Sequence, residues 1–399
     1  MSQLSRMTAP TARHHTARLV ATLLGHRRST LPAAPRALPG TAPRPAGTAT
    51  PIPTGPTGLG TSAARIGARK AAANSADGHG TGVPELYCPP AVRDDPALGQ
   101  EVNDRLVSWA EEVGLYAGRL DRVRAADFGR LMMLAHPDTD DPDRLLAAAR
   151  CALAEWATDD YYCDDETMGS RPELLGSHLG LAHAALDPAH LPDRYASAWE
   201  ADMRADPVRV ALRSALHDLA RYADSAQLAR LRHEVAVLFV GYGQEGSWRS
   251  RGHMPTVREY LAHRQINSFL PCIALVDVVS GHPLSASEYA DPRVRRVVTM
   301  AGTASTLVND LYSMTKEHQS SGVEFNLPTV IAEEERCSPG EAVERSVEIH
   351  DELVRTYETE AAALAVTGSP QLRHFLAGVW AWLGGNRAWH SGSLRYNDA

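Results

Sequence analysis

Apolar residues recur at helical spacing through most of the chain after residue 84. Two stretches show this most clearly, at Leu228, Leu231, Val235, Leu238, Phe239 and Tyr242, and at Val294, Val297, Val298, Ala301 and Ala304. Residues three and four apart share one face of a helix, so each stretch predicts a helix with a buried stripe. Strict alternation of apolar and polar residues, which is typical of strands, is not sustained anywhere.

Clusters of turn residues separate these helical stretches. They lie at 137–142, 170–172, 187–192, 281–283, 338–340 and 368–370. Proline and glycine at these places end one helix and begin the next. The pattern therefore predicts an all-α fold of about ten helices, in a single domain over residues 85–399. A bundle of that size can enclose a sizeable cavity.

Residues 1–84 have a different composition. They hold ten Lys or Arg residues and a single acid, Asp77, among repeated Pro, Ala, Thr and Gly. Such a segment has too little apolar surface to offset the entropy of ordering, so we predict a disordered arm. Its formal charge is about +9 against −8 for the whole chain, which leaves about −17 for the rest. A core this acidic argues against nucleic acid as its ligand.

Targeting signals and cysteines say little about specific chemistry. The apolar run Leu19–Leu24 is too short for the core of a signal peptide, and no stretch approaches the 18 apolar residues of a membrane span. The arm resembles a transit peptide in composition, but a disordered tail is the favoured interpretation. Five cysteines without a Cys-x-x-Cys pair indicate a reduced, cytoplasmic protein that is not bound to a membrane.

An acidic cluster closes one of the predicted helices. It reads Asp159-Asp160-Tyr161-Tyr162-Cys163-Asp164-Asp165-Glu166. Acidic runs at helix ends are usually solvated faces, and this is the alternative to a metal site. Leu153, Trp156 and Ala157 precede the cluster, however, so Asp159 continues an apolar stripe and points inward.

A second polar cluster lies about 150 residues further on. Asn309, Ser313 and Glu317 are spaced at i, i+4 and i+8, so all three project from one helix face. Amide, hydroxyl and carboxylate oxygens suit a hard cation such as Mg²⁺, and the absence of His and Cys argues against zinc. The alternative is that Asn309 and Ser313 form local hydrogen bonds while Lys316 and Glu317 are surface charges.

Together the two clusters resemble the metal motifs of bacterial class I terpene cyclases. The second matches the family's N-D-x-x-S-x-x-x-E pattern, and the first resembles its aspartate-rich motif in the expected order. Arg264, 45 residues before Asn309, matches the family's diphosphate-sensing arginine, and Arg395-Tyr396 resembles a pair near its C-terminus. The resemblance covers roughly residues 85–399. It implies a helical bundle enclosing an active site, and it suggests a homodimer.

The resemblance also implies roles for individual residues. Three Mg²⁺ ions would bridge a prenyl diphosphate to the metal ligands, which would be Asp159, Asn309, Ser313 and Glu317. The diphosphate would be bound by Arg264, Lys316, Arg395 and Tyr396, because guanidinium, ammonium and phenol groups donate to phosphate oxygens. The family's linker and effector positions, three and four residues after the sensor arginine, correspond to Asn267 and Ser268. The family usually has Asp and Gly there, so this match is weaker.

A narrower resemblance concerns the substrate. The segment Glu85–Pro96 after a proline-rich arm, together with the Tyr-Tyr-Cys filling of the first motif, is similar to one subgroup of the family. It implies 2-methylgeranyl diphosphate as the substrate and a bicyclic product formed by water capture or by loss of a proton. The cation formed on ionisation needs an apolar, aromatic wall. Candidate rings are Trp156, Phe239, Phe269, Trp382 and Trp389.

Two other classes of protein remain as alternatives. Prenyl diphosphate synthases are also helical magnesium enzymes, but they carry two Asp-Asp-x-x-Asp motifs, whereas the second motif here begins with Asn and has Ser at its centre. A helical phosphohydrolase or binding module is suggested by the dipeptides His217-Asp218 and His350-Asp351. These dipeptides lack further His ligands at a plausible spacing.

Overall fold

A computed structural model describes residues 83–164, 170–317 and 325–392. Within these ranges the chain is helical and forms no strand, as the periodicity predicts. The elements are α3 (Pro96–Glu112), α4 (Leu120–Ala126), α5 (Phe128–Ala135), α6 (Pro142–Asp159), the π-helical turn η1 (Asp160–Asp164), the 3-10 turn η3 (Pro172–Leu174), α7 (Leu175–Leu186), α8 (Asp193–Arg204), α9 (Pro207–Leu219), α10 (Ser225–Arg251), α11 (Val257–Arg264), α12 (Leu270–Ile273), α13 (Val276–Ser280), α14 (Ala286–Tyr289), α15 (Pro292–Glu317), α16 (Leu327–Glu335), α17 (Pro339–Thr367) and α18 (Pro370–Gly392). The predicted arm, residues 1–84, lies almost wholly outside the described residues.

The sequence marks many of these helix starts. Capping boxes begin α10 at Asp224, α11 at Thr256 and α17 at Ser338. In each box the cap side chain accepts from the backbone N–H of the third helical residue, and the Gln or Glu side chain of that residue accepts from the backbone N–H of the cap. Asp141 caps α6 just before a proline at its first position. The two clearest apolar stripes fall within α10 and α15. The helices number more than the expected ten because short ones, such as α12 to α14, fill the connections.

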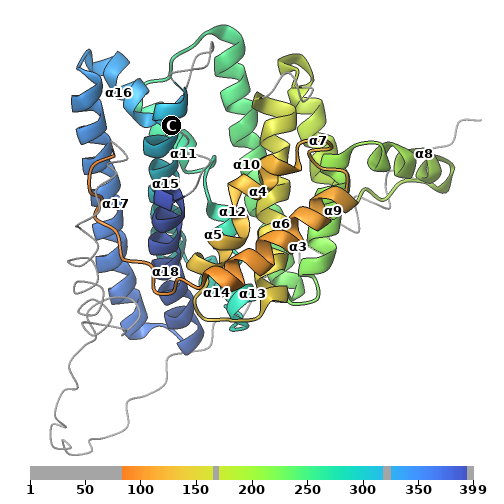
Figure 1. The fold of residues 1–399 in the computed structure, drawn as a ribbon, viewed down its shortest axis with the longest axis horizontal. Coiled ribbons are helices and arrows are strands. Elements are labelled where there is room, and N and C mark those ends of the chain that lie inside the picture. Colours follow the sequence, from red (N-terminus) through yellow and green to blue (C-terminus); the bar gives the residue numbers. More distant parts are fainter. Residues whose placement is uncertain (1–82, 165–169, 318–324, 393–399) are drawn as a thin grey trace, which may run out of the picture. The chain divides into compact units, whose positions relative to one another are not determined.

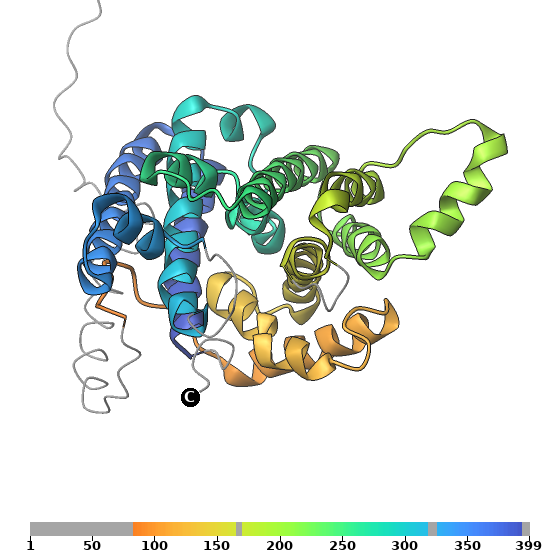
Figure 2. The ribbon, with the colours of Figure 1, turned by 90° about the horizontal axis from the view of Figure 1, so that it is seen from above.

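The long helices α15, α17 and α18 run side by side (Figures 1 and 2). Helix α5 packs against both α18 and α3, and α12 packs against both α15 and α10. Helix α8 projects from the others in both views, and only Met203 of its residues is buried. Close approach of α18 to α5 depends on Gly385, where a Cβ atom would lie 2.6 Å from the backbone of Leu134. No described helix is long and apolar enough to cross a membrane.

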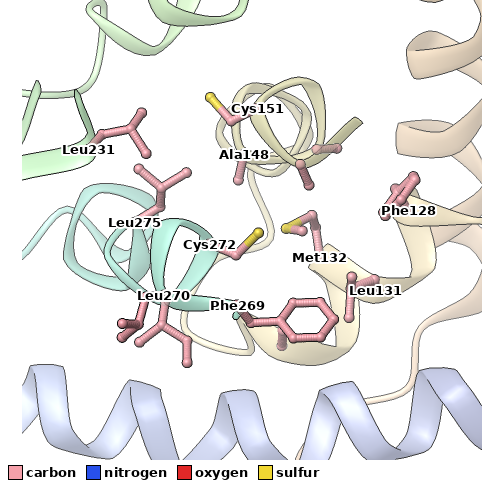
Figure 3. Close-up of a cluster of buried hydrophobic side chains, with 14 of the residues drawn as sticks. Phe128, Leu131, Met132, Ala148, Cys151, Leu231, Phe269, Leu270, Cys272 and Leu275 are labelled. Atoms are coloured by element: carbon pink, nitrogen blue, oxygen red, sulfur yellow. The ribbon is translucent and has the colours of Figure 1, made fainter. Parts of the chain in front are cut away.

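The apolar core brings α5, α6, α10 and α12 together. Figure 3 shows Met132, Ala148, Leu231 and Cys272 converging from these four helices. Met132, Ala148 and Leu231 are almost fully buried. This packing fixes α6, which ends at Asp159, against the short helix α12, which follows the break after Arg264.

The first described residues are attached to the helices near the C-terminus. The Tyr87 hydroxyl donates to Glu358 at 2.6 Å, and its backbone N–H donates to Asp351 at 2.8 Å, both on α17. Arg93 donates to the carbonyl oxygens of Met133 and His136 at the end of α5. These bonds tie residues 87–93 across the bundle.

Candidate functional site

The first acidic cluster begins where α6 gives way to a π-helical turn. Asp159 is the last residue of α6 and is half-buried, while the neighbouring Ala157 and Thr158 are buried. Residues 160–164 continue as a π-helix, a rare geometry that is frequent at functional sites. The side chains of Asp164 and of residues 165–169 lie outside the described residues. Asp159 thus lies, half-buried, where the buried stripe of α6 ends and the π-helical turn begins.

Hydrogen bonds from three directions hold this turn. The Tyr116 hydroxyl donates to Asp160 Oδ2 at 2.7 Å, and the Tyr162 hydroxyl donates to Asp206 Oδ2 at 2.8 Å. Arg249 on α10 donates to the backbone carbonyl oxygen of Cys163 at 3.0 Å. The turn is therefore held by hydrogen bonds at Asp160, Tyr162 and Cys163.

Helix α15 carries the second cluster. Asn309 and Ser313 are half-buried on it, and Asn309 Nδ2 lies 3.3 Å from His390 Nε2 on α18. Among the described residues, the Ser313 Oγ contact is a long one of 3.5 Å, to the carbonyl oxygen of Asp310. Lys316 and Glu317 form the end of the helix, and their side chains lie outside the described residues, as do Arg395 and Tyr396.

Arg264 is held in a buried network beside the second cluster. Its Nη2 donates to Asp310 Oδ1 at 2.7 Å and its Nε donates to the Tyr260 hydroxyl at 2.8 Å. Asp310 Oδ2 accepts from that hydroxyl and from the backbone N–H of Leu327. Burial raises the pKa of Asp310, and the contact with Arg264 opposes this shift. The predicted sensor arginine is thus linked directly to the residue after Asn309.

The chain between α11 and α12 is a break in the helix, at residues 265–269. Asn267 Nδ2 donates to Glu245 Oε2 at 3.0 Å, and Ser268 is buried. The break lies against the small-residue stretch of α15, because a Cβ atom at Gly302 would stand 2.9 Å from Leu270 Cγ and 3.4 Å from Ser268 Oγ. The absence of a side chain at Gly302 therefore allows this break to approach α15 closely.

An aromatic cluster connects the two predicted metal-binding clusters. Trp156 lies one turn before Asp159, and its ring centroid is 5.5 Å from Phe269 and 6.2 Å from Trp389. Phe269 is 6.1 Å from both Trp382 and His390, and His390 bonds to Asn309. The end of α6 and the middle of α15 thus meet at one set of rings. Of the candidate rings, only Phe239 lies elsewhere, where it stacks on Tyr242.

Glu155 is a buried carboxyl group one turn before Asp159, on α6. Its Oε2 accepts from the Cys272 thiol at 3.7 Å, and burial raises its pKa to about 8. Between pH of about 4.5 and 8 the unfolded chain has released this proton, whereas the folded protein retains it. The contribution of Glu155 to the free energy of unfolding therefore falls as pH rises through that window.

Replacing Glu155 with glutamine is expected to remove this pH dependence. Because glutamine has no charge to desolvate, the variant should gain stability over the wild type between pH 5 and pH 8, by up to roughly 4 kcal/mol. Urea unfolding of both proteins at a series of pH values measures the difference. If the free energy of unfolding changed with pH in the same way in both proteins, the raised pKa of Glu155 would be contradicted.

The alternative built on His-Asp dipeptides finds no support in the geometry. His350 and Asp351 contact one another on α17, where Asp351 also binds the Tyr87 backbone. Asp218 pairs with Arg150, in an ordinary ion pair between α9 and α6. Among the described residues no group of three or more His, Cys, Asp or Glu could hold a metal ion.

Sequence reasoning did not identify several residues of this site. Tyr260, Asp310 and His390 are buried and contact the predicted residues, yet none was assigned a role. For His390 the signal was a pair of polar residues inside an apolar helix, because Asn386 and His390 are four residues apart in α18, whose other buried positions are mostly Leu, Phe, Trp and Gly.

Comparison with known proteins agrees with this arrangement. Residues 151–356 match the model of terpene synthase family 2, C-terminal metal binding. The 2-methylisoborneol synthase of Streptomyces ambofaciens is 43% identical over 357 residues, which cover 86% of this chain and 80% of that protein. The 2-methylisoborneol synthase of Saccharopolyspora erythraea is 38% identical over 335 residues, covering 83% and 94%.

Solved structures give the same result. The crystal structure of 2-methylisoborneol synthase from Streptomyces coelicolor A3(2) with Mg²⁺ and geranyl-S-thiolodiphosphate matches with a TM-score of 0.74 and 43% identity, covering 79% of this chain and 98% of that one. Its complex with Mg²⁺ and 2-fluoroneryl diphosphate matches with a TM-score of 0.76. The fold is that of a class I terpene cyclase, an enzyme acting on prenyl diphosphates. The chain belongs to terpene synthase family 2 and, within it, to the group of the 2-methylisoborneol synthases, which confirms the resemblance seen in the sequence.

Proposed function

We propose that the chain ionises and cyclises 2-methylgeranyl diphosphate in a Mg²⁺-dependent reaction, and that water captures the final cation to give 2-methylisoborneol and diphosphate. The observation that carries the proposal is that the two oxygen-rich motifs meet at one aromatic cluster. Trp156 in this cluster lies one turn before Asp159 and contacts Trp389, and the adjacent His390 contacts Asn309. Its support is the 43% identity to a 2-methylisoborneol synthase solved with Mg²⁺ and a geranyl thiolodiphosphate.

The residues present suit Mg²⁺ in their chemistry. Carboxylate, amide and hydroxyl oxygens are the ligands that this ion takes, and the described part of the site offers no competing thiolate or imidazole set. In the proposal Asp159 holds metal on one side, and Asn309, Ser313 and Glu317 hold it on the other, with three ions in all. Bound Mg²⁺ supplies Lewis-acid neutralisation of the departing diphosphate.

Cationic side chains complete the diphosphate site in the proposal. Arg264 is fixed by Asp310 and Tyr260 through Nη2 and Nε, and its Nη1 makes no hydrogen bond to the described residues. That nitrogen is assigned to a diphosphate oxygen. Lys316, Arg395 and Tyr396 are assigned to the remaining oxygens, as the family resemblance implies.

The rest of the chemistry needs a dry, apolar surface. Heterolysis of the allylic C–O bond gives diphosphate and an allyl cation, and diphosphate recombines with the cation at C3 to give the linalyl form. Its C–O bond then breaks again, and the cation closes to a terpinyl and then a bornyl-type cation. Trp156 and Phe269 can present ring faces to these cations and exclude water until the last step. One water then adds to the final cation and loses a proton.

The partners, location and oligomeric state of the enzyme are also proposed. Its substrate is a small molecule, and the charge of about −17 on residues 85–399 disfavours nucleic acid as a partner. We also propose a cytoplasmic homodimer that does not bind membranes.

Release of inorganic diphosphate tests this function. Purified protein with Mg²⁺ is offered geranyl, 2-methylgeranyl and farnesyl diphosphates in parallel, with EDTA as the control. The proposal predicts the highest kcat/KM for the methylated substrate and no release in EDTA. Preference for farnesyl diphosphate would contradict the assigned substrate, and release in EDTA would contradict the metal site.

Removing residues 1–84 is expected to leave turnover largely intact. The hydrogen bonds of Tyr87 and Arg93 to the bundle are retained in that protein. A matched truncation of residues 1–95 removes them and should lower both the melting temperature and the turnover. Steady-state kinetics and thermal unfolding of both proteins provide the check. A large loss of kcat in the shorter truncation would refute the prediction.

A further inference from the structure

Helices α15 and α18 are joined by two hydrogen bonds that repeat at the same spacing. Asn386 Nδ2 donates to the carbonyl oxygen of Ser305 at 3.1 Å, and Asn309 Nδ2 lies 3.3 Å from His390 Nε2. In each helix the two residues are four apart, so both bonds lie on one face of each helix. Ser305, Asn386 and His390 are fully buried. The pair of bonds therefore fixes the register of α18 against the helix of the second motif.

The proton on His390 can be placed from its contacts. Its Nδ1 lies 2.9 Å from the carbonyl oxygen of Asn386, one turn back on α18. A carbonyl oxygen can only accept, so Nδ1 is the donor and Nε2 of the neutral ring is an acceptor. Nδ2 of Asn309 must then be the donor to Nε2.

This bond decides which way the Asn309 amide is turned. The amide nitrogen faces His390, so Oδ1 lies on the opposite side of the amide group. The oxygen and nitrogen of an amide are similar in size, and packing alone would not distinguish the two orientations. A hydrogen bond to an acceptor does distinguish them. Since a cation is bound by Oδ1 and repelled by the N–H groups, only one orientation makes Asn309 a ligand.

We propose that His390 is a positioning residue that aims Asn309 Oδ1 at the metal. The inference rests on the proposed function, in which Asn309 is a Mg²⁺ ligand.

Aromatic rings hold His390 in place for this role. Its ring centroid lies 4.6 Å from that of Trp389, 5.9 Å from that of Tyr312 and 6.1 Å from that of Phe269. With Nδ1 bonded to Asn386 as well, the imidazole has one orientation. Partners of this kind, which bond to a ligand instead of the metal, set the affinity of many metal sites.

Three substitutions at His390 distinguish the effect of the hydrogen-bond acceptor at Nε2 from the effect of the aromatic ring. His390→Gln places an amide oxygen near the position of Nε2 and can still accept from Asn309. His390→Asn is one methylene shorter and reaches only toward Asn386, and His390→Phe keeps a ring without nitrogen. Binding of Mg²⁺ with inorganic diphosphate is measured by calorimetry for each protein, with thermal unfolding in EDTA as the check on folding.

We expect the wild type and His390→Gln to bind Mg²⁺ and diphosphate with affinities of the same order. His390→Asn and His390→Phe should bind Mg²⁺ about 10- to 100-fold more weakly, as loss of such a partner usually causes. Equal affinity in all four folded proteins would overturn the inference and leave the proposed function standing. Equal weakening in all three variants would also overturn it, because an amide acceptor in place of Nε2 would then not restore the position of Asn309. Absence of binding by the wild type would overturn the proposed function as well.

Discussion

Turnover of 2-methylgeranyl diphosphate should fall at least about a hundredfold when Asn309 or Glu317 is replaced by alanine. Each change removes one oxygen ligand of the proposed Mg²⁺ site, and a lost Lewis-acid contact with the leaving group costs several kcal/mol in the transition state. Because the leaving group must be neutralised before the C–O bond breaks, kcat falls with kcat/KM. Measuring diphosphate release over a range of Mg²⁺ concentrations tests this expectation.

A control for these variants is an ion pair between α15 and the neighbouring helix α17. Glu360 on α17 pairs with Arg296 on α15 at 3.0 Å, and the exposed fractions of the Arg296 and Glu360 side chains are 57% and 37%. Glu360→Gln should leave turnover unchanged. Wild-type activity in Asn309→Ala and Glu317→Ala would rule out the second motif as the metal site.

Replacing Asp310 with asparagine should destabilise the fold by about 3 to 5 kcal/mol. The exposed fraction of the Asp310 side chain is 1% and that of Arg264 is 11%, so the change leaves a buried guanidinium without its carboxylate. The Tyr260 hydroxyl and the Leu327 N–H also lose part of their acceptor. Urea unfolding at neutral pH measures the loss.

The exposed pair provides the matched comparison for this prediction. Glu360→Gln breaks the Arg296 ion pair at the surface, where solvent screens the charges, and should cost far less stability than the change at Asp310. The difference between the two substitutions isolates the effect of burial. Equal losses in the two variants would show that Arg264 does not depend on Asp310.

Much of the fold could be predicted because it is recorded locally in the chain. Apolar spacing predicted α10 and α15, and turn residues predicted the boundaries before α6 and α17. The break at residues 265–269 could not be seen in the same way. It contains no glycine or proline, and its only signal is Pro271 in the first turn of α12. Tertiary contact with α15, at Gly302, accompanies it.

In the site, too, the features that lie close together in the sequence could be predicted, and those that join distant residues could not. Asn309 and Ser313 were predicted to share a face because their spacing of four is a property of one helix. The partners of the second motif lie far away in sequence: Arg264 is 46 residues from Asp310, and His390 is 81 residues from Asn309. No periodicity in the chain encodes such pairs, since they arise only when α11 and α18 pack against α15.

Product analysis in water labelled with ¹⁸O tests the central claim most directly. The purified enzyme is given Mg²⁺ and 2-methylgeranyl diphosphate, and the volatile product is identified by gas chromatography and mass spectrometry. The account predicts one main product, a methylated bicyclic alcohol that carries the heavy oxygen, because the C–O bond to diphosphate breaks and a solvent water captures the cation. A hydrocarbon as the main product, or an alcohol without the label, would contradict it.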